Sequence, residues 1–527
     1  MGCQLESQGA ALQELQKTFA SKGVLLCGVD RIEHPYDVED YLRHFGFSFP
    51  VFVDMSEESP PVAGASLGSI AILDRDRHRV RLGGKNQFEP EQAKAALEKV
   101  VASLPSRGNG LTNAPRVLRP SPDGRKFMPP RMAVADWSEP TRLGTGKYPR
   151  IVSLGGGRAV CVWVTGEVPQ QQLEYGLYSA GRWTESRPVP AGQDAHAVAA
   201  DVNADGRAVI VWSRKDAEGY RIYLSTWLGD KWQEPVAISP AGQNVFRPDV
   251  FCLPSDASTP SPSSSSSLFS TSSPRTVVAW YGWKRVKLRN YPNAWWRSTY
   301  VCEIAENKPG VPCELAELRR GSDDCWDPVI TGTGKDLWVS WLRDENPPKL
   351  WASANRGSAW SAPESLLRLP GVGTSFRVQA ASPIRAARSR PGVVFEMFSL
   401  GGPGRFRAGT HVYMTRLREN GWTDPVPLCS LPGRHVAPVG VEVAGEKLLL
   451  FWCNLPGQGK SSTILMREAN AGAEDRVPER FAITSEGSNS YPSVAADSAG
   501  LVWLAWQSEE ANAAQAIYVS FWRSVRR

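Results

Sequence analysis

Seven positions recur along the chain at similar spacing, and six of them hold a polar or aromatic residue with ligand-binding potential. Each lies just before a proline, or before the residue that takes its place, at the start of an apolar segment. Successive members are 48, 51, 80, 50, 60 and 54 residues apart, and they are Tyr148, His196, Arg247, Asp327, Arg377, Ala437 and Tyr491. Guanidinium groups bind anions through paired hydrogen bonds, while the other polar members add acceptors, donors and aromatic faces. Brought together, they would bind an anionic or sugar-like ligand.

A structural interpretation of these positions is also open. Residues that open a strand often form hydrogen bonds that hold the turn and satisfy the neighbouring element. The sequence alone does not choose between a ligand site and a set of turn residues.

The elements that must position these residues form a repeat. In the segment from His196 to Ser239, four short apolar stretches alternate with turns at 203–206 and 215–219. The second stretch recurs at 160–164, 209–212, 277–283, 337–342, 393–398, 448–453 and 502–507, and a Trp-bearing fourth stretch recurs at 182–189, 231–238, 359–366 and 421–428. Four-stranded repeats of about 40 to 50 residues are typical of a β-propeller. The first strand of each blade lines the central channel, so the seven residues are expected at the channel mouth.

The two ends of this repeat array complement each other. The last repeat supplies three strands and stops without its fourth. Residues 136–144, DWSEPTRLG, lie ahead of the first repeat and match the sequence pattern of the fourth strands. We therefore expect 136–143 to pair with 517–523 and to close an all-β propeller of seven blades over 136–527. Closure would remove the open sheet edges that promote aggregation.

One repeat resembles the Asp-box of sialidase-type propellers. Residues 353–360 read Ser-x-Asn-x-Gly-x-x-Trp, with shorter forms at 179–183 and 419–422. That resemblance implies an arginine triad for a substrate carboxylate, for which Arg150, Arg247 and Arg377 are the candidates. The chain lacks the Phe-Arg-Ile-Pro opening of the family, and a Tyr-Glu nucleophile pair cannot be assigned. Seven repeats also exceed the six blades of sialidases.

The N-terminal segment has a different periodicity. Helical patterns at 4–23, 35–46 and 90–104 alternate with apolar strands at 24–30, 49–54 and 69–74, which is an α/β layout. The phrases ALQELQKTFASKGVLLCGVD, FGFSFPVFVD and SIAILDRD resemble the thioredoxin-like redoxins over about residues 3–104. The resemblance implies that Cys3 matches the second cysteine of a redox pair.

Two departures from the redoxin pattern bear on activity. The first strand and the first cysteine that should precede Cys3 are absent, and residues 66–68 read Ser-Leu-Gly where the family carries a cis-proline. Either the natural protein begins upstream with an export signal and a complete motif, or domain 1–104 has lost its redox chemistry. We expect the latter.

Composition completes the domain layout. Residues 105–135, rich in Pro, Gly and Arg, form a predicted linker, and the serine tract at 255–274 is predicted to be a disordered insertion. Cys302 and Cys313 flank a predicted turn, so either a disulfide or two reduced thiols are expected. The net charge of +6, from 60 basic and 54 acidic residues, does not indicate nucleic-acid binding. No apolar run is long enough for a membrane helix, no spacing resembles a zinc site, and no cofactor is predicted.

Three functions remain open. The favoured one is a non-catalytic binding or scaffold protein whose propeller binds a protein or carbohydrate at the channel mouth, with a redox-inactive thioredoxin-like adaptor. The alternatives are a thiol-disulfide oxidoreductase with a propeller for substrate selection, and a sialidase-like glycoside hydrolase. The two resemblances imply an extracytoplasmic location, although the chain as given begins without a signal segment.

Overall fold

The computed structural model describes part of the N-terminal segment and most of the C-terminal 400 residues. The described residues are 11–19, 28–30, 43–44, 51–53, 71–73, 79–82, 91, 94–95, 97–98 and 129–523, the last range with gaps at 168–169, 204, 254–274, 289–290, 306–307, 316–324, 334–335, 344–348, 357–358, 367–376, 386–393, 402–410, 419–420, 424, 430–433, 444–446, 456–460, 471–479 and 511–513. The chain divides into one unit of 1–121 with 285–295 and a second of 122–284 with 296–527.

In the first unit, residues 11–19 form one continuous helix with Leu15 and Phe19 on its buried side. Strands β1 (Gly28–Asp30) and β2 (Val51–Val53) pair in parallel, and β3 (Ala71–Leu73) and β4 (Arg79–Leu82) form an antiparallel pair. These elements alone do not show the predicted thioredoxin-like domain. Cys3, the 66–68 segment and the serine tract lie outside the described residues.

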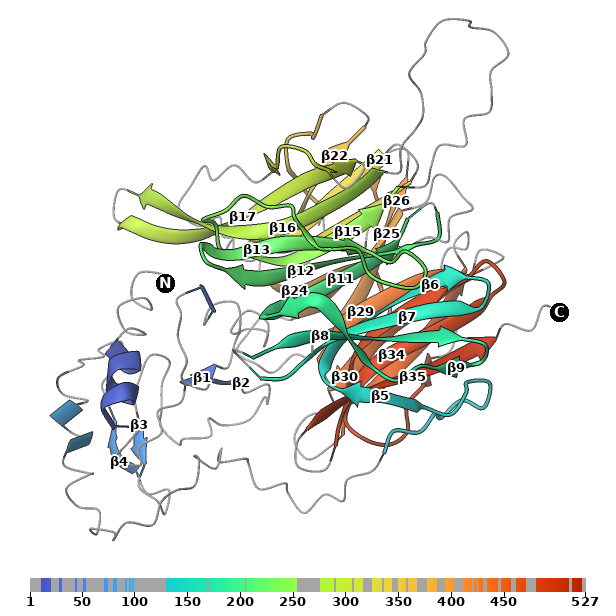
Figure 1. The fold of residues 1–527 in the computed structure, drawn as a ribbon, viewed down its shortest axis with the longest axis horizontal. Coiled ribbons are helices and arrows are strands. Elements are labelled where there is room, and N and C mark those ends of the chain that lie inside the picture. Colours follow the sequence, from blue (N-terminus) through green and yellow to red (C-terminus); the bar gives the residue numbers. More distant parts are fainter. Residues whose placement is uncertain are drawn as a thin grey trace, which may run out of the picture. The chain divides into compact units, whose positions relative to one another are not determined.

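The second unit is built of antiparallel meanders that follow the predicted repeats (Figure 1). Repeat 1 contains β6 (Lys147–Gly155), β7 (Arg158–Thr165), β8 (Gln172–Ser179), β9 (Arg182–Trp183) and β10 (Arg187–Gln193). Repeat 2 contains β11 (Ala195–Val202), β12 (Ala208–Asp216), β13 (Gly219–Thr226) and β14 (Val236–Ala237). Repeat 3 contains β15 (Val245–Cys252), β16 (Arg275–Leu288), β17 (Tyr291–Ala305), β18 (Lys308–Pro309) and β19 (Cys313–Glu314).

The remaining repeats have the same order. Repeat 4 contains β20 (Cys325–Thr333), β21 (Asp336–Arg343), β22 (Lys349–Asn355) and β23 (Glu364–Ser365). Repeat 5 contains β24 (Arg377–Arg385), β25 (Val394–Gly401), β26 (His411–Arg418), β27 (Gly421–Trp422) and β28 (Val426–Pro427). Repeat 6 contains β29 (Arg434–Val443), β30 (Lys447–Leu455), β31 (Thr463–Asn470) and β32 (Arg480–Ala482), and repeat 7 contains β33 (Asn489–Ala496), β34 (Leu501–Glu509), β35 (Gln515–Arg523) and β5 (Thr141–Thr145).

The described repeats assemble into six sheets in a propeller arrangement rather than the seven separate sheets expected. Repeats 5 and 6 share one nine-stranded sheet, because their first strands pair in parallel through Ile384 with Gly440 and Arg385 with Val441. The first strands still follow one another around a closed circuit, in the order β6, β11, β15, β20, β24, β29, β33 and back to β6. Apolar side chains between successive sheets form the core, with Trp163, Trp212, Trp280, Trp452 and Trp506 fully buried.

The expected closing strand is present. β5 pairs antiparallel with β35, with Thr141 opposite Val519 and Ile517 opposite Gly144 (Figure 1). The ladder begins at Thr141 rather than at residue 136, since Pro140 has no N–H to contribute, and Trp137 forms an isolated bridge to Trp522. The upstream residues also depart from the predicted linker: the Ala133 N–H donates to the Ile483 carbonyl at 3.0 Å, which extends repeat 6.

The turns between third and fourth strands of repeats 2, 4 and 5 share one hydrogen bond. In repeat 4 the Ser353 hydroxyl donates to the Ser361 carbonyl at 2.7 Å, and Asn355 bridges Trp360. The hydroxyls of Ser225 and Thr415 make the same bond to the carbonyls of Gln233 and Thr423, each at 2.7 Å. The likeness of these turns to an Asp-box stays a prediction.

Candidate functional site

The residues predicted to line the channel mouth lie at a β-bulge that recurs in the first strands. In repeat 1, Lys147 pairs with Val164 and Arg150 with Val162, so Tyr148 and Pro149 together oppose Trp163. The first bulge residue has a left-handed backbone, with φ of 58° at Tyr148, 47° at Ala197, 49° at Arg247, 50° at Asp327, 51° at Ala437 and 51° at Tyr491. In the same order, the opposing residues are Trp163, Trp212, Trp280, Trp341, Trp452 and Trp506.

Local sequence accounts for this geometry. An unpaired bulge residue needs no ladder donor, so the second position accepts the proline that follows five of these six residues. A left-handed backbone costs about 1–2 kcal/mol for a residue with a side chain. The buried indole opposite each bulge supplies packing that offsets this cost, and the bulge changes the direction of the first side chain relative to the pleat. We call the end of the second unit at which the first strands begin the entry end.

Two of the predicted positions are misaligned. In repeat 2 the left-handed residue is Ala197, and the His196 side chain is buried at 1 % exposure with its ring 6.2 Å from that of Phe246. In repeat 5 the register shift lies between Val378 and Ala380, so Arg377 pairs with Gly401 ahead of the bulge. In neither repeat does a proline directly follow the bulge residue, which explains the errors of one and two positions.

The structure brings the predicted residues together as neighbouring pairs. The Tyr148 and Tyr491 rings meet edge to face, with centroids 5.1 Å apart and planes at 87°. Arg247 and Asp327 form an ion pair across the boundary of repeats 3 and 4, with side chains 11 % and 16 % exposed. A largely desolvated ion pair is less screened than a surface pair. Both pairs link residues far apart in sequence, 343 and 80 positions respectively.

Arg150 has a different environment. Its Nη1 donates to the carbonyl of Pro149 at 3.1 Å, so its guanidinium lies against its own bulge. Arg247 is instead bonded to Asp327, and the side chain of Arg377 is outside the described residues. The arginine triad implied by the sialidase resemblance therefore stays a prediction.

Sequence reasoning missed the bonds that hold the entry end. The residue after the tryptophan in the second strand bonds to the next repeat: Ser213 Oγ donates to the Val245 carbonyl at 2.7 Å, and Cys453 Sγ contacts the Asn489 carbonyl at 3.4 Å. Gln507 Oε1 accepts the N–H of Tyr148 at 2.9 Å, across the closure. All three residues directly follow the second-strand tryptophan, and this constant position could have identified them from the sequence.

A second missed feature concerns the indole N–H groups. His435 Nδ1 and Asn489 Oδ1 accept from Trp452 and Trp506, at 3.0 and 2.9 Å. Each acceptor lies two residues before the left-handed bulge residue. In repeats 1 to 4 this position holds Gly146, Ala195, Val245 and Cys325, and the indole nitrogens opposite them have no acceptor among the described residues. Among repeats 1 to 4, 6 and 7, this core position is thus hydrogen bonded in repeats 6 and 7.

The strand register shows which of the two states predicted for Cys302 and Cys313 is present. Cys302 and Cys313 are free thiols, because the register places Val301 opposite Cys313 and the side chain of the next residue points to the other face of the sheet. Burial raises the pKa of Cys302 to about 11, with a smaller contribution from nearby Glu303. Across the described residues no group of three metal-ligating side chains occurs, and no helix there has the length and apolarity to cross a membrane.

The solved structures that align with this chain do so at low TM-score and low identity. No protein-family model matches the chain, and no curated protein matches its sequence. A Dyadobacter fermentans protein of unknown function aligns with a TM-score of 0.44 and 12 % identity, over 74 % of this chain and 99 % of its own. A Penicillium chrysogenum α-L-arabinanase complexed with arabinobiose aligns at 0.39 and 10 %, over 62 % and 92 %. A leech intramolecular trans-sialidase aligns at 0.38 and 9 %, over 73 % and 68 %.

Proposed function

We propose that this protein is a non-catalytic binding protein whose propeller binds a carbohydrate at the entry end. We count the nine-stranded sheet as two blades, because it contains two complete meanders and contributes two strands to the inner circuit. On that count the ring has seven blades, and the bulge residues surround its axis.

The observation that carries the proposal is the repeated left-handed bulge, which in four of the six repeats where it is described is occupied by tyrosine, arginine or aspartate. Strained non-glycine conformations persist where the surrounding structure enforces them, and they concentrate at functional sites. Tyr491 lies against Tyr148 and remains partly exposed, which suits the apolar face of a sugar ring. Arg247 and Asp327 fix each other and offer donors and acceptors for hydroxyl groups.

Binding is favoured over hydrolysis by the arrangement of charge. Glycoside hydrolysis normally requires two carboxyl groups on either side of the bond, one of them able to donate a proton. Among the bulge residues, Asp327 supplies one carboxylate, and that carboxylate is ion paired with Arg247. Tyr148 and Tyr491 contact each other.

For the first unit we retain the proposal of a redox-inactive, thioredoxin-like adaptor in an extracytoplasmic protein. The proposal rests on the sequence resemblance, since the described elements of this unit are one helix over 11–19, a parallel strand pair and an antiparallel pair. A cysteine-reactivity and insulin-reduction assay on the full chain tests it, and turnover would contradict it.

The carbohydrate proposal is tested by screening the full chain on a glycan array and measuring the best hits by calorimetry. We expect Tyr491→Ala and the double variant Arg247→Ala/Asp327→Ala to weaken binding at least tenfold. The double variant avoids leaving one charge buried without its partner. Arg158→Ala is the matched control, because this exposed arginine lies at the turn that follows β6, at the opposite end.

Two outcomes would contradict the proposal. One is equal affinity in wild type and in both entry-end variants, provided their thermal melting curves remain cooperative. The other is release of product from a panel of fluorogenic glycosides, which would make the protein a hydrolase.

A further inference from the structure

The hairpin between β12 and β13 carries two arginines directly opposite each other. Arg214 pairs with Arg221 in the ladder, and Arg214 also pairs with Ala195, the first residue of β11. Both arginines therefore lie toward the entry end of repeat 2. Like charges at directly opposite positions destabilise a strand pair unless a counter-charge is present.

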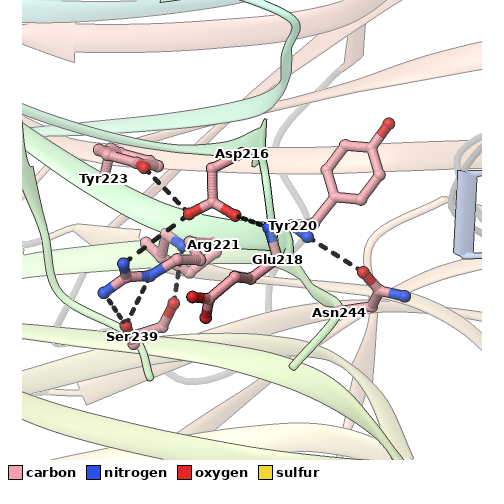
Figure 2. Close-up of polar contacts among 8 residues, drawn as sticks. Asp216, Glu218, Tyr220, Arg221, Tyr223, Ser239 and Asn244 are labelled. Atoms are coloured by element: carbon pink, nitrogen blue, oxygen red, sulfur yellow. Dashed lines mark hydrogen bonds and ion pairs between the residues drawn. The ribbon is translucent and has the colours of Figure 1, made fainter. Parts of the chain in front are cut away.

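Protein contacts fix both guanidinium groups. Arg221 donates from Nε and Nη2 to the Ser239 carbonyl, at 3.1 and 2.8 Å, as Figure 2 shows. Arg214 donates from Nη1 to the Ala191 carbonyl at 3.0 Å, and its Cζ lies 3.8 Å from the centre of the Tyr223 ring. Guanidinium groups held in this way lose little further freedom when they bind an anion.

The counter-charge within the cluster is incomplete. Asp216 Oδ2 lies 3.7 Å from Arg221 Nη1 and accepts the Tyr223 hydroxyl at 3.4 Å (Figure 2). Its other oxygen accepts the backbone N–H of Glu218 at 2.9 Å. Asp216 thus forms only a long ion pair with Arg221, and Arg214 contacts a carbonyl and an aromatic ring rather than a carboxylate. Both side chains are partly exposed, so a carboxylate from outside has access to them.

The adjoining sheet edge indicates what would carry that carboxylate. β14 is the last strand of its four-stranded sheet, pairs with β13 through Val236 and Ala237, and leads to Ser239. The Val236 side chain is 36 % exposed. An exposed edge strand pairs with extended peptides through backbone hydrogen bonds. Arg214 covers one face of Tyr223, so a sugar ring cannot stack on that face. The exposed side chain beside it, Val236, is aliphatic and suits an apolar side chain of a peptide.

We propose that the β14 edge binds an extended acidic segment of a partner protein. A carboxylate of that segment binds Arg214 and Arg221, an apolar side chain packs on Val236, and the backbone extends the sheet of repeat 2. Neither arginine is a bulge residue, and the proposal does not depend on carbohydrate binding.

The test uses a fluorescein-labelled peptide of alternating Glu and Val, seven residues long, and its Gln-Val counterpart, with anisotropy measured on the full chain. We expect the Glu peptide to bind and the Gln peptide to bind at least tenfold more weakly. Arg214→Gln/Arg221→Gln should weaken Glu-peptide binding at least tenfold, and Arg158→Gln should change it less than twofold. Asp216→Asn, which keeps the turn acceptor but removes the competing charge, should tighten binding.

Several results would overturn the proposal. Equal binding of the Glu and Gln peptides would remove the role of the carboxylate. Unchanged binding in a cooperatively melting double arginine variant, or weaker binding in Asp216→Asn, would remove the arginine pair. Full displacement of the peptide by chondroitin sulfate, with tighter binding of that polysaccharide, would identify an acidic saccharide as the ligand. An N-methylated Glu peptide that binds as well as the parent would remove the sheet-edge pairing.

Discussion

Arg142 of β5 and Glu510 of the β34–β35 turn join the two ends of the ring, with Nε 2.6 Å from Oε1 and Nη2 3.1 Å from Oε2. Two parallel bonds of this kind hold a carboxylate in a fixed orientation. The Tyr518 hydroxyl donates to the same carboxylate at 3.1 Å. The bond to Arg142 lowers the pKa of Glu510 below its ordinary value of 4.5.

This shift predicts an acid-sensitive closure. A carboxyl whose pKa is lower in the folded state stabilises the fold above its unfolded pKa and loses that effect as pH falls. We expect Glu510→Gln to lower the melting temperature modestly at pH 7 and to have a smaller effect at pH 3. The contribution is well under about 1 kcal/mol, since the pair is partly exposed and screened by salt. Melting curves at pH 7, 5 and 3, with and without 1 M salt, check this; an equal deficit at every pH would contradict it.

Trp137 predicts how much the segment ahead of the ring contributes to stability. Its ring is 6.0 Å from that of Phe451 in repeat 6 and 6.3 Å from that of Trp522 in repeat 7, and it is 6 % exposed. Trp137→Ala should cost about 3–5 kcal/mol of unfolding free energy, as for other buried aromatics. Chemical denaturation measures this, with exposed Leu228→Ala as the control expected to cost under about 0.5 kcal/mol. Similar losses in both variants would show that the Trp137 contacts add no more stability than an exposed side chain does.

The left-handed bulge predicts that replacing one alanine by glycine does not destabilise the protein. Ala437 has φ of 51° and is partly exposed, so glycine removes the left-handed penalty there. Ala437→Gly should leave stability unchanged or raise it by up to about 1 kcal/mol. The matched change at buried Ala279, within β16, should lower stability by about 1 kcal/mol. If Ala437→Gly lowered the free energy of unfolding as much as Ala279→Gly does, the left-handed conformation assigned to Ala437 would be wrong.

Thiol chemistry tests the geometry of repeat 3. A raised pKa and burial make Cys302 slow to react in the folded protein, whereas Cys313 is exposed. Cys313→Ser should remove one rapidly labelled thiol, and Cys302→Ser should remove one that labels only after denaturation. Mass spectrometry of the unreduced protein should show both as free thiols. A bonded 302–313 peptide would refute the register.

Short sequence patterns predicted much of the fold. Proline after Tyr148, Arg247, Asp327, Ala437 and Tyr491 marked the bulges because a residue without an N–H is tolerated where the ladder is interrupted. Where the proline is missing, in repeats 2 and 5, the alignment failed by one and two positions. The merged sheet of repeats 5 and 6 had no sequence signal, since parallel pairing between first strands depends on how two sheets approach each other.

The sequence by itself determined the repeat, the N-terminal strand that closes it and the bulge residues of the five repeats that carry the proline, because all three follow from short patterns of apolar, proline and tryptophan residues. Only the tertiary structure decided that Tyr148 meets Tyr491, that Arg247 is bonded to Asp327 and that Arg214 faces Arg221 beside an open edge. Side-chain contacts between repeats depend on the registers and orientations of neighbouring sheets, and these are set by packing among residues far apart in the chain.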